Sequence, residues 1–110
     1  MDYCTADYYR CQTTAVTALA DWLAAGAAQG CPPMDWTMTT TGVLVARSLA
    51  PTAAQQRTAW AAWTDFLGAT PWPESARADG MVHLHAVARN PRGTELMVAL
   101  VADLFPDQDV

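Results

Sequence analysis

The chain has 110 residues, of which 52% are hydrophobic, so it can form one small hydrophobic core and is not intrinsically disordered. Its formal net charge is −5, its pI is about 4.6, and all six basic residues are arginines. The absence of lysine excludes Schiff-base chemistry and a P-loop phosphate site. Six scattered arginines in an acidic chain argue against nucleic acid as a partner.

The first residues, Met1 to Asp7, are polar and acidic, without the basic and apolar stretches of a signal peptide. The apolar runs at 42–46 and 96–102 are too short to span a bilayer. We therefore expect a cytoplasmic protein with no membrane association.

Three cysteines match neither zinc-site nor redox-motif spacing. We expect them to be reduced, with a disulfide from Cys31 to Cys4 or Cys11 as the alternative.

Apolar residues at helical spacing predict a first helix over about residues 8–28, ended by Gly30 and the prolines after Cys31. One apolar stripe along it is predicted to comprise Tyr8, Cys11, Ala15, Val16, Leu19, Trp22 and Leu23.

β-Branched and aromatic residues predict strand over residues 34–48. A turn at Thr41-Gly42 makes this a hairpin that pairs 35–39 with 43–48, and a single bent strand is the alternative.

The clearest helix is predicted after Pro51, where Thr52 and Gln55 fit a capping box and Gly68 ends the segment. Residues 69–80 are predicted to be a linker, because the two prolines beside Trp72 keep it extended. Residues 81–89 and 94–103 are predicted strands, joined by a turn at residues 90–93.

The predicted element order is therefore α-β-β-α-β-β. Its natural packing is an α+β fold with two helices on one face of a small antiparallel sheet. We expect one compact domain over residues 1–110, with frayed ends at residues 1–6 and 106–110.

The last hairpin sorts its side chains onto two faces once Arg89 is placed opposite Thr94. One face then combines polar side chains with an apolar row, and its members are Met81, His83, His85, Val87 and Arg89 on one strand and Leu96, Val98, Leu100 and Ala102 on the other. A face with such an apolar row is either partly buried within the monomer or meets another chain, and exposed apolar rows of this kind often mark interfaces. We therefore predict that this face binds a protein partner and that the chain forms a homodimer.

His83 and His85 are the two histidines, and on a strand both side chains point the same way, so both could reach one metal ion. Their strand neighbours supply no third ligand at this register, which favours hydrogen-bonded or solvated histidines over a metal site. No flanking signature supports a cysteine–histidine nucleophile, and the carboxylates are scattered at element ends. We therefore expect a non-enzymatic protein without a cofactor or a catalytic residue.

Trp72 lies between two prolines and outside both helical stripes. A tryptophan on a stiff loop can anchor a protein partner, or it can fold back as a lid over the edge of the sheet. The sequence leaves these alternatives equally open.

Three stretches stand out for their composition: Ala59 to Gly68 (AWAAWTDFLG), Asp79 to Leu84 (DGMVHL) and Val98 to Ala102 (VALVA). They resemble small uncharacterised proteins of high-GC Gram-positive bacteria that often accompany phages or integrative elements. The likeness spans roughly residues 15–105. It implies a small cytoplasmic accessory protein and brings no catalytic residue with it.

Small size, acidity, an apolar strand face and the lack of a catalytic motif together predict a protein–protein interaction module. Immunity proteins, secretion chaperones and phage proteins that inhibit host machinery have this character. The alternative is a small-molecule or metal-binding domain that uses His83 and His85.

Overall fold

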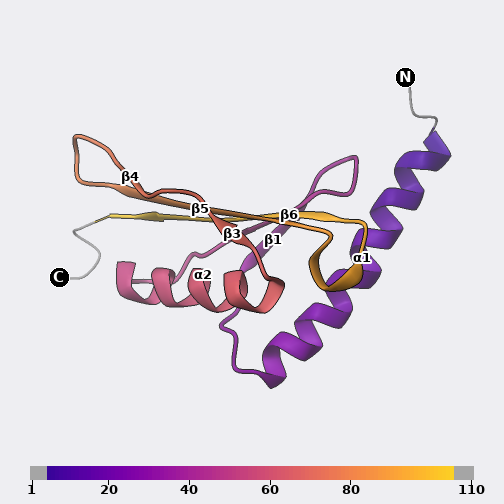
Figure 1. Cartoon of the computed structure of the whole chain (residues 1–110), viewed down its shortest axis with the longest axis horizontal. Coiled ribbons are helices and arrows are strands. Elements are labelled where there is room, and N and C mark those ends of the chain that lie inside the picture. Colours follow the sequence, from indigo (N-terminus) through magenta and orange to yellow (C-terminus); the bar gives the residue numbers. More distant parts are fainter. Residues whose placement is uncertain (1–4, 106–110) are drawn as a thin grey trace.

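A computed structural model describes residues 5–105 of the chain (Figure 1). This part contains two α-helices and six β-strands. In chain order the elements are α1 (Thr5–Ala28), β1 (Asp35–Met38), β2 (Leu44–Arg47), α2 (Ala53–Leu67), β3 (Thr70–Pro71), β4 (Ser75–Ala76), β5 (Val82–Arg89) and β6 (Met97–Leu104). A short 3-10 turn, Pro91–Gly93, lies between β5 and β6. The predicted α+β fold class is confirmed.

The strands form one mixed sheet in the order β1-β2-β6-β5-β3, and β4 pairs with β5 as well. β6 runs parallel to β2 and antiparallel to β5. The expected antiparallel sheet is therefore wrong in two respects. One strand pair is parallel, and the short strands β3 and β4 occupy the segment expected to be a linker, where they pair with the otherwise unpaired edge of β5.

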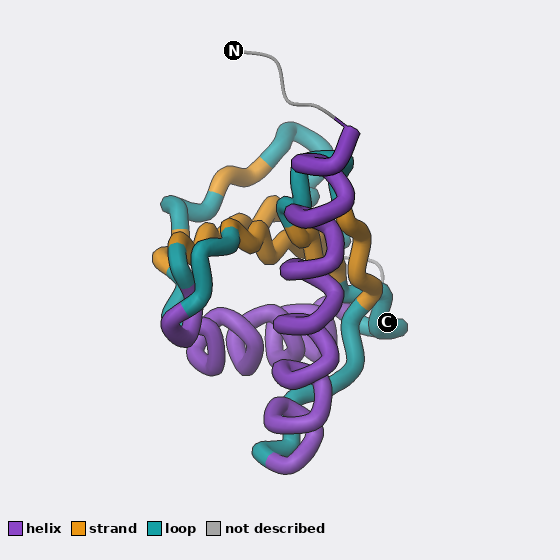
Figure 2. The backbone as a smooth tube through the Cα atoms, turned by 90° about the vertical axis from the view of Figure 1, so that its right-hand side faces the viewer, coloured by secondary structure: helices purple, strands orange, loops and turns teal. Residues whose placement is uncertain are grey.

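Both helices contribute to a core on the same side of the sheet (Figures 1 and 2). α2 lies under the strands in Figure 1, and Figure 2 shows α1 crossing one end of the sheet. The side chains of the strands that face this core are small or branched: Leu44, Ala46, Leu84, Ala86, Ala88, Val98, Leu100, Ala102 and Leu104.

The hairpin predicted at residues 34–48 is confirmed, since β1 and β2 pair antiparallel from Asp35 opposite Arg47 to Met38 opposite Leu44. Its turn depends on Gly42, whose φ is +84°. A Cβ at this position would lie 2.7 Å from the carbonyl oxygen of Cys11 on α1. The glycine therefore allows both the turn and the close approach of the helix.

α1 begins at Thr5, inside the segment expected to be frayed, while residues 1–4 and 106–110 lie outside the described part. The predicted single apolar stripe is wrong, because Ala15 and Trp22 are buried whereas Val16 and Leu23 are 54% and 44% exposed. With Tyr9, these two residues form an outward line at seven-residue spacing, which we call the α1 stripe.

α2 begins with the predicted capping box between Thr52 and Gln55, and it ends at Gly68 with a left-handed φ of +65°. Its central side chain is Trp63, whose Nε1–H donates to the carbonyl oxygen of Pro32 at 2.6 Å. The Trp63 ring meets the rings of Trp36 and Phe66 edge-on, with centroids 5.2 and 5.3 Å apart. These contacts join α2 to β1 and to the segment that precedes it.

The register predicted for the last hairpin is wrong, because Arg89 lies opposite Met97 and not opposite Thr94. Asn90 and Arg92 both have left-handed φ angles, and the amide of Asn90 donates to the carbonyl oxygen of Leu96, so the connection is longer than the expected turn. The shift is an odd number of residues, which moves β6 side chains to the opposite face. Val98 and Leu100 are consequently 0% exposed in the core, and Leu96 packs partly buried against it.

Candidate functional site

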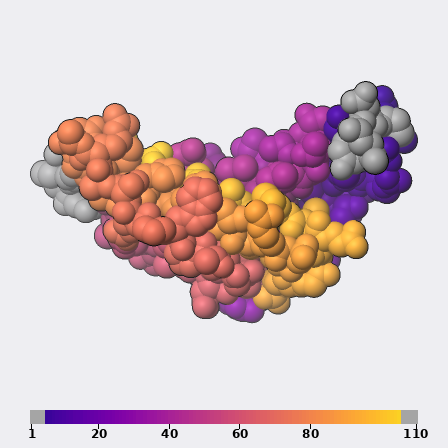
Figure 3. All heavy atoms as spheres, turned by 45° about the horizontal axis from the view of Figure 1, so that its top comes forward, coloured from indigo at the N-terminus to yellow at the C-terminus, as the bar shows by residue number. Residues whose placement is uncertain are grey.

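The side of the sheet opposite the core is not covered by either described helix, and we call it the open face. Figure 3 looks toward this side, with the segment around β4 rising at one end and α1 at the other. Because side chains alternate along strands, register assigns the face its members. They are Val45 and Arg47 on β2, Met97, Ala99, Val101 and Asp103 on β6, and His83, His85, Val87 and Arg89 on β5.

The centre of the open face is apolar. Val45 and Ala99 are direct neighbours across the parallel β2–β6 pair, and Ala99 is opposite Val87 on β5. These three side chains are half-buried by their neighbours. A water-facing sheet surface normally alternates to polar residues, so this centre has the character of a contact surface.

A charged cluster adjoins the apolar centre, with Asp103 at its middle. One carboxylate oxygen of Asp103 is 2.6 Å from Nδ1 of His83, its direct neighbour on β5. The other accepts from Nη1 of Arg47 at 2.8 Å. The hydrogen bond from His83 lowers the pKa of Asp103 most, partial burial opposes that effect, and Arg47 adds to the lowering. The carboxylate is thus held ionised between two donors.

His85 and Trp72 form a stacked pair beside this cluster. Their ring centroids are 4.0 Å apart and the planes differ by 8°. The pairing of β3 with β5 brings Trp72 there, and its backbone N–H donates to the carbonyl oxygen of His85 at 2.8 Å. Burial, followed by the nearby His83, lowers the pKa of His85. The neutral imidazole is therefore favoured under Trp72.

Trp72 combines the two alternatives that the sequence left open. It folds back over β5 as a lid would, yet 55% of it remains exposed. Arg89 lies farther along the same strand, and together with Thr70, Val87 and Trp72 it borders a hollow of about 320 Å³. Trp72, His83, His85 and Arg89 therefore share one surface, while Leu96, Val98 and Leu100 do not belong to it.

The arrangement of the two histidines does not favour a metal site. His83 is bound to Asp103, and His85 is covered on one side by Trp72. Within residues 5–105, no group of three or more histidine, cysteine, aspartate or glutamate side chains is placed to hold a metal ion. Cys11 and Cys31 are free, and burial together with the charge of Asp65 raises the pKa of Cys31, which keeps this thiol protonated.

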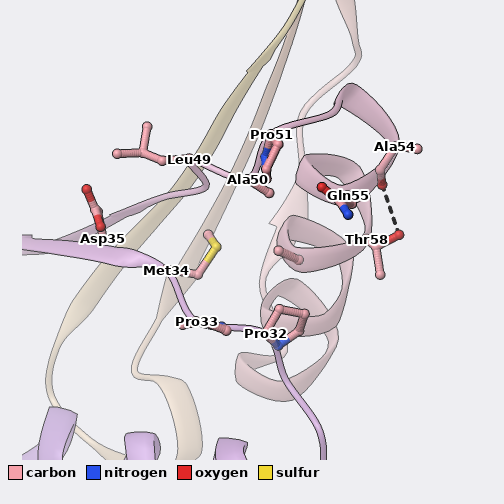
Figure 4. A pocket seen from close by; sticks show the side chains of 11 residues that line it. Pro32, Pro33, Met34, Asp35, Leu49, Ala50, Pro51, Ala54, Gln55 and Thr58 are labelled. Carbon is pink, nitrogen blue, oxygen red and sulfur yellow. Dashed lines mark hydrogen bonds between the residues drawn. The ribbon is translucent and has the colours of Figure 1, made fainter. Parts of the chain in front are cut away.

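A second surface feature is a cleft on the other side of β1, next to α2 (Figure 4). Its volume is about 640 Å³, and its walls come from residues 32–35, residues 49–51 and the first half of α2. Three prolines line it, together with Met34, Leu49 and alanines. We call this feature the proline cleft.

Arg47 and Asp103 are the members of the charged cluster that sequence reasoning missed. They lie on β2 and β6, and their side chains meet because these strands are parallel neighbours. A charged residue at the end of each of two apolar strands was the available signal. Choosing this pair among all acids and arginines requires the parallel register, which the local sequence does not encode.

No family model, curated protein or solved structure matches the chain. Among the described residues, no helix combines the length and the apolar character needed to cross a membrane.

Proposed function

We propose that this chain is a non-enzymatic protein-binding module whose open face associates with a second copy of the chain. The observation that supports this most is the uncovered apolar centre formed by Val45, Val87 and Ala99. In the proposed dimer, two such faces pack as the sheets of a β-sandwich do, about 10 Å apart.

The distribution of charge favours a second copy as the occupant. The chain carries a net charge of −5, so two copies repel each other over most of their surfaces. On the open face, Arg47 and Arg89 balance Asp103 and Asp35, which lies opposite Arg47 at the corner of the face. A face with equal numbers of positive and negative groups can meet itself without this repulsion.

Trp72 supplies the rim with a large partly exposed aromatic side chain, a residue type enriched among the anchors of protein interfaces. The area is modest. Three strands that lie about 4.8 Å apart and are about six residues long give a face of roughly 300 Å² in projection. Standard interfaces bury about 800 Å² per partner, so the proposed dimer should dissociate on dilution.

The test is the mass of the full chain in solution, measured by sedimentation velocity over a roughly hundredfold range of concentration. We expect the wild type to pass from monomer to dimer. Val45→Glu places like charges at the centre of both faces and should leave a monomer that circular dichroism shows to be folded. The control Val16→Glu makes the same change on the α1 stripe and should still form dimers.

Two results would contradict the proposal. A wild type that stays monomeric at every concentration removes the dimer itself. A dimer that Val16→Glu abolishes and Val45→Glu preserves places the contact on the α1 stripe instead.

A further inference from the structure

The hollow beside Trp72 lies where β3 pairs with β5, at the edge of the open face, and we call it the edge hollow. Its volume is about 320 Å³, and its lining residues are Gly68, Thr70, Trp72, Val87 and Arg89. Thr70 lies directly opposite Val87, and Arg89 follows Val87 two residues later on the same strand. The side chains of these three residues therefore point to the same side of the sheet.

Trp72 is a preformed wall of the edge hollow. Prolines at positions 71 and 73 restrict its backbone on both sides, and its N–H donates to the carbonyl oxygen of His85 at 2.8 Å. The indole ring stacks on the imidazole of His85 with centroids 4.0 Å apart, yet Trp72 remains 55% exposed. A flat ring that is already held in place suits a flat apolar ligand, because it does not have to be ordered when the ligand binds.

Arg89 gives the edge hollow a positive charge that no described side chain neutralises. The other five arginines each have a partner within residues 5–105: Asp7 for Arg10, Asp103 for Arg47, Glu74 for Arg57, Asp79 for Arg77, and the carbonyl oxygen and ring of Phe66 for Arg92. Among the described residues, none forms an ion pair with Arg89, and no acidic residue lines the hollow. In a chain with a net charge of −5, this local charge favours an anion over a cation.

The dimensions of the edge hollow limit the ligand. Residues on one face of a strand lie about 6.6 Å apart, so His85 under Trp72 is about 13 Å from Arg89, with the apolar Val87 between them. A volume of about 320 Å³ is at the lower end of the range of small-molecule sites. A guanidinium binds a carboxylate through two parallel hydrogen bonds, and the acidic chain repels a single negative charge less than several. We propose that the edge hollow binds a small molecule with a flat apolar body and one carboxylate.

The probes for the test share one ring system and differ in charge: naphthoic acid, naphthalenemethanol and naphthylmethylamine. Isothermal titration calorimetry of the full chain should show that the acid binds most tightly, although the net charge of the chain favours the amine. Arg89→Gln should weaken binding of the acid about fivefold and leave binding of the alcohol unchanged. The control Arg77→Gln removes the same charge from an exposed residue near the other end of β5 and should leave both affinities nearly unchanged.

A second pair of variants tests the location. Thr70→Phe fills the hollow from β3 and should abolish binding of all three probes. Ser75→Phe places the same ring at an exposed position on β4, outside the hollow, and should leave binding intact. Circular dichroism checks that both variants are folded. In the wild type, the acid should shift the NMR signal of the Trp72 indole N–H and leave that of the buried Trp63 in place.

Each of three results overturns the proposal. The first is that the acid binds the wild type no more tightly than the amine does. The second is that Arg89→Gln and Arg77→Gln weaken binding of the acid equally, because overall charge would then account for the effect. The third is that the acid still binds a folded Thr70→Phe protein or leaves the Trp72 signal unshifted.

The edge hollow lies within one copy of the chain, so this inference does not rest on the proposed dimer. Light scattering on the same samples records the oligomeric state, because Arg89 also contributes to the charge balance of the open face. A chain that stays monomeric and binds the acid contradicts the dimer alone, whereas a dimer that does not bind the acid contradicts the ligand site alone.

Discussion

At the scale of single residues, Asp103 joins side chains from three strands. It lies on β6 and binds His83 on β5 and Arg47 on β2, across the two neighbours of its own strand. All three side chains are between 30% and 47% exposed, so water weakens these interactions and no one of them dominates stability. Their effect is to fix the positions of the charged groups on the open face.

Replacing Asp103 by asparagine should lower the free energy of unfolding by about 1 kcal/mol near neutral pH. The sign of the pH dependence follows from the lowered pKa of Asp103, whose ordinary value is 3.8. The carboxylate stabilises the folded state fully above that value and loses its effect as the pH falls through the lower folded pKa. Urea unfolding in a series starting at about pH 5 should therefore show the two proteins converging in acid. A difference that grows toward acid would contradict this account.

The lowered pKa of His85 gives a second prediction of pH dependence. Here the folded state favours the neutral form of the side chain, whereas it favours the charged form of Asp103. Burial lowers the pKa of His85 from the ordinary 6.5, so the unfolded chain binds a proton more readily than the folded protein. The free energy of unfolding should therefore fall as the pH drops below about 6.5. NMR titration should find His85 titrating below 6.5, and Trp72→Ala, which uncovers its ring, should raise its pKa. A wild-type His85 that titrates at or above 6.5 would contradict the described stacking.

At the scale of elements, the contact between α1 and α2 depends on a missing side chain. Gly26 lies against the six-membered ring of Trp63, and a Cβ there would be 2.5 Å from Cη2. The ring cannot move away easily, because its Nε1–H is bound to the carbonyl oxygen of Pro32 and it packs edge-on with the rings of Trp36 and Phe66. This explains a glycine inside a helix, where alanine is intrinsically better by about 1 kcal/mol.

Gly26→Ala should therefore destabilise the fold by about 1–2 kcal/mol, despite the gain in helix propensity. Urea unfolding measures the change. In a double-mutant cycle with Trp63→Phe, the smaller ring makes room for the added methyl group, so the cost of Gly26→Ala should shrink in that background. A Gly26→Ala protein as stable as the wild type would show that the helices are packed less closely than described.

Elements with local signals were predictable, and pairings set by distant residues were not. The capping box at Thr52 and the glycine after α2 mark that helix in the sequence itself. The β5–β6 register depends on the left-handed φ angles of Asn90 and Arg92. Because neither residue is a glycine, the sequence does not indicate these angles or the longer connection that they produce. That one register decides which face carries Val98 and Leu100, so the β5 residues of the predicted site lie on the open face whereas Val98 and Leu100 of β6 lie in the core.

At the scale of the whole molecule, the open face and the proline cleft lie on opposite sides of the sheet and differ in the side chains that they present. The open face is balanced in charge and apolar at its centre, which suits a second copy of the chain. The proline cleft is lined mostly by prolines, alanines, Met34 and Leu49, and Asp35 lies only at its outer end.

The position of β6 in the middle of the sheet has a consequence for synthesis. β6 lies between β2 and β5, although it follows both in the chain. While the ribosome is still making β6, these two strands lack their final neighbour and expose unpaired backbone edges. Joining β2 to β6 also closes a long loop, which makes this step slow. The nascent chain, more than the finished protein, is therefore the species that needs protection from aggregation.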